Sequence, residues 1–207
     1  MKNINIETRN YIQNKFLKES YKKKLSDHFE KIFKKILENT NKPNDVLNIF
    51  DKNFKFNFKL KDLKKFKTYK QIAIIGMGGS ILGVEAINHF LKNKIKKKIY
   101  FFNDFNSKNI FEIKKLQSNK ILFIIISKSG NTTETIFNLV SLNIIQKNSK
   151  NIIIITEKTN NPLHLLSKKM NLFLIEHKRF IGGRYSVLSE VGILPSYFMG
   201  IQTAALR

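Results

Sequence analysis

The amino-acid sequence predicts an α/β fold in which a doubly wound, five-stranded parallel sheet is preceded by N-terminal helices. Two observations carry this prediction. From residue 70 onward, five short apolar runs without polar alternation follow one another: Ile72–Ile75, Ile99–Phe102, Ile121–Ile126, Ile152–Ile155 and Leu172–Ile175. Such runs are typical of strands that are covered on both faces. Roughly 15 to 25 residues separate consecutive runs, which is enough for the crossover helix that parallel strands require.

Amphipathic segments follow each of these runs and predict helices. The predicted helices span about residues 80–93, 107–118, 132–147, 162–169 and 187–200. Ligands of such sheets bind beyond the carboxyl ends of the strands. The loops that follow the apolar runs are therefore the expected location of a functional site.

The first 66 residues have a different pattern and predict a helical segment. Apolar residues of segment 7–39 recur at the spacing of one helix face, and the polar stretch that ends at Pro43 terminates it. A short helix is expected over 45–50, and the alternation over 54–60 is closer to a strand or an extended packing segment. We place the domain boundary near residue 67, which gives an N-terminal helical segment, 1–66, and a sheet domain, 67–207.

Basic residues outnumber acidic ones, 38 to 15, and leave a formal net charge of +23. A basic surface patch is what a nucleic-acid partner requires. The excess is nearly all lysine, however, whereas phosphate and base recognition favours arginine. The joint abundance of Lys, Asn and Ile points instead to an AT-rich genome. Nucleic-acid binding stays open as an alternative, and it predicts retention on DNA that falls steeply with salt.

Several kinds of site and location are excluded or disfavoured by residue content. The chain has no cysteine, which excludes disulfides, thiolate zinc sites and a thiol nucleophile. Its four histidines are widely spaced and form no metal-binding pattern. Its longest wholly apolar run, Ile121–Ile126, is far shorter than the ~20 residues that cross a bilayer, and the N-terminus lacks a signal-peptide core. We expect a cytoplasmic protein with no membrane segment, metal or other cofactor.

The first strand is followed by a glycine turn (residues 76–80, Gly-Met-Gly-Gly-Ser) that leads into a helix. Glycines let the main chain approach an anion, and Ser80 is expected to cap the helix while contacting a phosphate. A dinucleotide site is the rival interpretation, encouraged by Asp104 after the second strand. The full G-x-G-x-x-G spacing fails, because position 81 is Ile. A tight turn that serves packing alone also stays open.

The third strand is followed by a hydroxyl loop (residues 127–135, Ser-Lys-Ser-Gly-Asn-Thr-Thr-Glu-Thr). Its hydroxyls, its ammonium group and the helix N-terminus that it enters suit a phosphate dianion. An ordinary Ser/Thr-rich capping turn would explain one or two of the hydroxyls. Because the glycine turn lies at the same end of the sheet, we expect one phosphate to be held between the two loops.

The fifth strand is followed by an arginine segment (residues 182–192, Gly-Gly-Arg-Tyr-Ser-Val-Leu-Ser-Glu-Val-Gly). Its two glycines allow a tight turn that carries Arg184 toward the same end of the sheet. A guanidinium there could stabilise an oxygen that becomes anionic during a reaction. Alternatively, Arg184 pairs with Glu134 or Glu190 in a structural ion pair.

Together, the glycine turn, the hydroxyl loop and the arginine segment resemble three successive motifs of the glucose-6-phosphate isomerase family, in the family's order and spacing. That family is built from sugar isomerase (SIS) domains of flavodoxin-like fold, and the resemblance covers about residues 70–200. It implies a glycolytic and gluconeogenic enzyme that interconverts glucose 6-phosphate and fructose 6-phosphate through a cis-enediol. It also implies that the full-length protein is a homodimer and that the reaction needs neither metal nor nucleotide.

The resemblance also assigns roles to individual positions. The phosphate cradle falls on the following residues: Gly79, Ser80, Ser127, Lys128, Ser129 and Thr132. Arg184 matches the arginine that stabilises the enediolate, and Glu134 matches a supporting acidic residue. Residues 129–131 depart from the versions commonly seen in the family, but Ser129 keeps the hydroxyl.

The family's proton-transferring glutamate and its ring-opening histidine and lysine belong to the second SIS domain and the C-terminal region. We therefore expect this chain to be an N-terminal fragment that lacks the second SIS domain and binds sugar phosphates without turning them over. The alternative is a stand-alone SIS domain that binds a sugar phosphate and regulates a partner.

Overall fold

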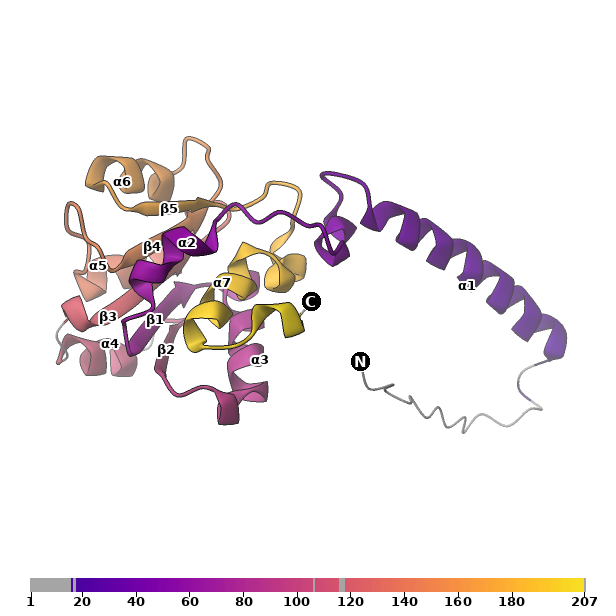
Figure 1. Cartoon of the computed structure of the whole chain (residues 1–207), viewed down its shortest axis with the longest axis horizontal. Helices are drawn as coiled ribbons and strands as arrows, with labels where there is room; N and C mark the ends of the chain where they lie inside the picture. The colour runs from indigo at the N-terminus through magenta and orange to yellow at the C-terminus, as the bar shows by residue number, and fades with distance from the viewer. Residues whose placement is uncertain (1–15, 17, 106, 116–117, 207) are drawn as a thin grey trace.

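The computed structural model describes residues 16, 18–105, 107–115 and 118–206. Five parallel strands form one sheet in the order β2-β1-β3-β4-β5 (Figure 1). Their bounds are Gln71–Gly76 (β1), Lys98–Phe102 (β2), Ile121–Ile126 (β3), Ile152–Thr156 (β4) and Phe173–Glu176 (β5). The predicted doubly wound parallel sheet is confirmed, and each apolar run lies within or overlaps one strand.

Helices fill each connection between strands, as predicted. Their bounds are Leu82–Phe90 (α3), Ser107–Lys114 (α4), Thr133–Leu142 (α5), Pro162–Met170 (α6) and, after β5, Glu190–Met199 (α7). Short 3-10 turns occur at Gly78–Ser80 (η4), Lys92–Lys94 (η5), Ser118–Lys120 (η6), Gly183–Leu188 (η7) and Thr203–Leu206 (η8). Helix α5 ends earlier than predicted, because Asn143 adopts a left-handed conformation with φ 50° and closes the helix.

Each face of the sheet has its own hydrophobic core, because successive side chains of a strand point to opposite faces. Ile74 and Ile124 lie on the face covered by α3, α7 and the 3-10 turn at Lys64–Phe66 (η3). Ile75 and Ile125 lie on the other face, where α4, α5 and α6 cover them. Burial on both faces explains why the strands are continuous apolar runs.

The connections that follow the two central strands, β1 and β3, cross opposite faces of the sheet. β1 and β3 are hydrogen-bonded neighbours, with Gly76 paired to Ile126 at their carboxyl ends. From β1 the chain crosses one face through α3 to β2, whereas from β3 it crosses the other face through α5 to β4. The carboxyl ends of β1 and β3 therefore form the topological switch point, where ligands of open α/β sheets bind.

The N-terminal segment consists of α1 (Glu19–Thr40), η2 (Val46–Phe50), α2 (Leu60–Leu63) and η3. Helix α1 extends away from the sheet, and none of its residues is buried (Figure 1). Residues 7–15 and 17 of the predicted first helix lie outside the described residues. Residues 54–59 form no strand in the described chain and bend at 57–58, and the rings of Phe54, Phe56 and Phe58 are in contact.

No described helix combines the length and the apolar character needed to span a membrane.

The end of the N-terminal segment packs against the sheet. Leu63 and Phe66 are buried in the same core as Ile74 and Phe198. The domain boundary near residue 67 stays a prediction.

Candidate functional site

The glycine turn begins where β1 ends, and η4 occupies its last three residues. Gly78 has a φ of +53°, a conformation that glycine adopts without strain. The expected capping role of Ser80 is wrong, because the N-cap of α3 is Ile81 and Ser80 lies within η4. Within the residues that the structure describes, the half-buried Ser80 hydroxyl forms no hydrogen bond, so it is available to a ligand.

The hydroxyl loop is held together by Ser127. This side chain is 2% exposed; its Oγ lies 2.9 Å from Thr132 Oγ1 and accepts a 3.1 Å hydrogen bond from the Gly130 N–H. Thr132 is the N-cap residue of α5, but its side chain makes no capping bond to the described first turn of that helix. The N–H groups of this turn are thus left for another acceptor, and a helix N-terminus favours an anion.

The glycine turn and the hydroxyl loop lie side by side. A β-carbon at Gly76 would lie 2.9 Å from Ile126 O and 3.4 Å from Ser80 Cβ. Ser80 therefore lies beside Ile126, the last residue of β3, and Ser127 is the next residue in the chain. The two loops that the sequence analysis paired meet at the switch point between β1 and β3.

The arginine segment also packs on the glycine turn. A β-carbon at Gly79 would lie 2.8 Å from the Gly183 α-carbon, so the two main chains touch. Ser186 Oγ lies 3.1 Å from Gly79 O and 2.7 Å from Gly183 O, within donating distance of both carbonyls. Two loops that are more than 100 residues apart in sequence are thereby joined.

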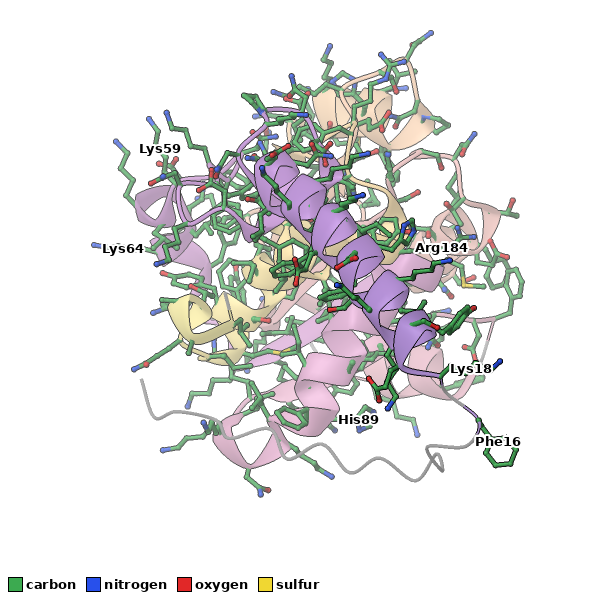
Figure 2. All side chains as sticks on the ribbon, turned by 90° about the vertical axis from the view of Figure 1, so that its right-hand side faces the viewer. Phe16, Lys18, Lys59, Lys64, His89 and Arg184 are labelled. Carbon is green, nitrogen blue, oxygen red and sulfur yellow. The ribbon has the colours of Figure 1, made fainter. Side chains whose placement is uncertain are left out.

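Arg184 projects from this junction and is exposed (Figure 2). In the described part of the chain it forms no ion pair, neither with Glu134 nor with Glu190. Glu190 is 1% exposed; its Oε1 accepts a 2.8 Å bond from the Asn57 N–H and lies 3.8 Å from Lys178 Nζ. The interpretation of Arg184 as one half of a structural ion pair is not supported by these contacts.

The remaining predicted site residues of this loop and of α5 are Lys128, Ser129 and Glu134. The ammonium of Lys128 donates a 2.7 Å bond to Arg179 O and lies 3.5 Å from the Glu157 carboxylate. It is therefore held by the segments that follow β4 and β5. Ser129 is exposed, and Glu134 is half-buried in the first turn of α5.

A buried histidine that the sequence analysis did not single out lies next to these loops. His177 is 2% exposed, and its Nδ1 lies 3.0 Å from Lys178 O. Burial is the main influence and lowers the pKa of this imidazole. The hydrogen bond to Lys178 O opposes that shift; the charge of Lys128 adds to it and that of Glu157 opposes it.

Elsewhere, Glu85 on α3 accepts a 2.8 Å bond from Asn103 Nδ2. Burial raises the pKa of Glu85, with His89 opposing the shift and Asp104 adding to it.

Across the described residues, no group of three or more His, Asp or Glu side chains could hold a metal ion. An apolar cavity of about 420 Å³ lies between α5 and α6. Its lining includes Leu139, Val140 and Leu163 and none of the predicted site residues.

Comparison with protein-family models matches residues 35–204 to the family described as phosphoglucose isomerase. This match includes all three motifs and most of the chain. The chain belongs to the phosphoglucose isomerase family. The resemblance drawn from the three motifs is confirmed.

Curated glucose-6-phosphate isomerases are similar to this chain over most of its length. The enzyme of Mycoplasma capricolum is 32% identical over 84% of this chain and 45% of its own length. That of Campylobacter jejuni is 32% identical over 77% of this chain and 40% of its own length. That of Acholeplasma laidlawii is 36% identical over 70% of this chain and 36% of its own length. The chain spans about two fifths of the length of these phosphoglucose isomerases.

Solved structures share the fold. A hypothetical protein of Thermus thermophilus superimposes with a TM-score of 0.68 at 23% identity, covering 89% of this chain and 46% of that one. A glucose-6-phosphate isomerase of Chlamydia trachomatis superimposes with a TM-score of 0.55 at 24% identity, covering 65% of this chain and 27% of that one. The roles that the phosphoglucose isomerase family implies for individual residues stay predictions.

Proposed function

We propose that this chain supplies the sugar-phosphate-binding sheet domain of a glucose-6-phosphate isomerase. One observation carries the proposal: the glycine turn and the hydroxyl loop meet at the switch point between β1 and β3. Family membership and similarity to curated glucose-6-phosphate isomerases support it. The whole enzyme would be a cytoplasmic homodimer that interconverts glucose 6-phosphate and fructose 6-phosphate through a cis-enediol.

The phosphate of the sugar would bind at this switch point. The Ser80 hydroxyl and the free N–H groups of the α5 first turn would provide short, directed donors for a dianion. Because Ser127 and Thr132 are hydrogen-bonded to each other, this pair would add one further O–H donor. Gly79, whose side-chain position is filled by Gly183, would contribute through its main chain, and Ser129 would add a hydroxyl from the exposed side of the loop. Lys128 contributes positive charge to the same region while its ammonium stays bonded to Arg179 O.

The reacting carbons of the sugar would lie toward the arginine segment. Arg184 would stabilise the negative charge of the enediolate, because an exposed guanidinium without an ion pair in the described chain can approach a substrate oxygen. Glu134 would support this region from the first turn of α5. We assign the transfer of the proton between C1 and C2 to the part of the relatives' length that this chain does not match.

The test is calorimetric titration of the purified chain with fructose 6-phosphate, glucose 6-phosphate and fructose. Both sugar phosphates should bind, and fructose should not bind at the same concentrations. Thr132→Val, which removes one hydroxyl, should weaken both sugar phosphates. Arg184→Ala should leave the affinity for inorganic phosphate unchanged, because Arg184 is assigned to the reacting carbons.

Failure of a folded chain to bind either sugar phosphate would overturn the proposal. Binding of NADH that sugar phosphates do not displace would favour the dinucleotide interpretation instead. A coupled assay on the same samples should detect no conversion of fructose 6-phosphate. Rapid conversion would contradict the assignment of proton transfer to the unmatched part of the family.

A further inference from the structure

Asn161 lies at the start of α6, beside the hydroxyl loop, and is 5% exposed. Its Oδ1 accepts a 2.9 Å bond from the His164 N–H and so caps the helix. Its Nδ2 donates a 2.8 Å bond to Glu157 O and a 3.0 Å bond to Thr159 Oγ1. Because both ends of the amide are bonded, the orientation of this side chain is fixed.

Gly130, in the middle of the hydroxyl loop, packs directly on this amide. Its φ is +70°, and a β-carbon at this position would collide with Asn161 Oδ1 and lie 2.9 Å from Thr156 Oγ1. Thr156 is the last residue of β4 and is fully buried. The turn at Gly130 thus rests on two fixed polar side chains from the neighbouring strand and helix.

Hydrogen bonds tie the main chain of the loop to the same support. Gly130 O accepts a 3.1 Å bond from the Leu163 N–H. Lys128 O accepts bonds from the Glu157 N–H, at 3.1 Å, and from Thr156 Oγ1, at 3.3 Å. The connection between β4 and α6 therefore sets the position of the peptide groups on both sides of Ser129.

The position of Gly130 in turn sets the hydroxyl pair. The Gly130 N–H donates to Ser127 Oγ, which is bonded to Thr132 Oγ1. A chain of direct contacts thus runs from Asn161 through Gly130 and Ser127 to Thr132.

We propose that Asn161, with Thr156, is a positioning residue for phosphate binding, which holds the hydroxyl loop in the conformation that directs its donors at one anion. This inference rests on the proposed function. Asn161 would not touch the ligand; it would act through Gly130. A residue with only a capping role in α6 would affect the stability of the helix but not the affinity for phosphate.

The test separates these two roles with Asn161→Ser. Serine also caps helices well, so α6 should keep its start, but it is shorter and would leave Gly130 without its support. The dissociation constants for fructose 6-phosphate and for inorganic phosphate should both rise roughly tenfold, the order of effect of mutations that act through a packed chain of contacts. Thr156→Val should raise them in the same direction.

The matched control is Asn171→Ala at the opposite end of α6. Asn171 closes the helix with a φ of 50°, so its replacement should also destabilise α6. Its side chain, however, donates to Asn148 Oδ1 at the other end of this nine-residue helix, whereas Asn161 packs on Gly130. Affinity should stay that of the wild type. Circular dichroism and urea unfolding show whether each variant is folded; should Asn161→Ser not fold, Thr156→Val carries the test.

Wild-type affinities in folded Asn161→Ser and Thr156→Val would overturn the inference, and so would an equal loss in Asn171→Ala. A wild-type chain that binds no sugar phosphate would instead overturn the proposed function. The two failures are therefore distinguishable.

Discussion

Gly79 and Gly183 touch through their main chains, with no side chain between them. The contact is asymmetric. A β-carbon on Gly79 would lie 2.8 Å from the Gly183 α-carbon, whereas a β-carbon on Gly183 would lie 3.6 Å from the Gly79 α-carbon, an ordinary contact distance. The glycine turn and the arginine segment are thus joined at a point where only one of the two residues must be glycine.

Gly79→Ala should destabilise the chain by about 1–3 kcal/mol, because the added methyl group overlaps main-chain atoms that cannot rotate away. It should also weaken sugar-phosphate binding, since the glycine turn must shift. Urea unfolding and calorimetry measure the two effects. Gly183→Ala is the matched control and should change the free energy of unfolding by less than about 0.5 kcal/mol. Equal effects of the two substitutions would contradict the asymmetric contact.

Ser127→Ala should destabilise the chain by about 1–3 kcal/mol, because it leaves the buried Gly130 N–H without its acceptor. The loss of the bond to Thr132 should also weaken binding of fructose 6-phosphate. Urea unfolding and calorimetric titration check both. Ser149→Ala is the control. Among the described residues, Ser149 Oγ bonds only to the nearby Gln146 O, in an exposed turn, so little change is expected. Wild-type behaviour of Ser127→Ala would show that the loop does not depend on this hydroxyl.

The sequence was sufficient to predict the sheet, because a strand covered on both faces must be apolar at every position. β3 is the clearest case, with all six residues buried. The meeting of the glycine turn and the hydroxyl loop could also be predicted, since both follow central strands of one parallel sheet. Contacts of long side chains could not: the position of Lys128 depends on Arg179 O, which lies 51 residues away in sequence.

Local sequence signals predict the helix starts near the site only in part. Ser80 is a good capping residue by type, but η4 delays the start of α3 and leaves Ile81 at the N-cap. An Asn directly before Pro162 is a typical helix start, so the sequence carries a signal for the capping role of Asn161. Its contact with Gly130 requires the neighbouring strands to be in place, so no spacing rule would have revealed it.

His177 should make stability fall in mild acid. Burial holds the pKa of the folded imidazole below its ordinary value of 6.5, so below that pH the unfolded chain binds a proton more readily than the folded chain. The contribution of His177 to the free energy of unfolding is fully present above pH 6.5 and is lost as the pH falls from there toward the folded pKa. Urea unfolding at about pH 7.5 and about pH 5.5 measures it.

His177→Asn should lose less stability than the wild type between these two pH values, because the titrating group is gone. His28→Asn, on the exposed surface of α1, should follow the wild type. An identical pH dependence in the wild type and His177→Asn would show that the folded imidazole takes up its proton as easily as the unfolded one.

The apolar side of α1 should promote self-association of the chain. Phe29 and Phe33 stack with ring centroids 5.7 Å apart, yet they are 63% and 48% exposed. Replacing both by serine should leave the free energy of unfolding within about 0.5 kcal/mol and lower the light scattering of concentrated solutions. Phe66→Ser is the contrast: its buried ring packs against Phe173 and Phe198, so several kcal/mol should be lost. Unchanged scattering of the double variant would contradict the prediction.

Among the described strands β2 is an edge of the sheet, with β1 as its neighbour on one side. An edge strand is a place where a strand of another molecule can pair. Lysines concentrate there: Lys92, Lys94, Lys96 and Lys98 are all exposed at or just before this strand. Like charges on two such edges repel, so one molecule cannot easily extend its sheet with the β2 of another. At this place the lysine excess thus opposes edge-to-edge aggregation.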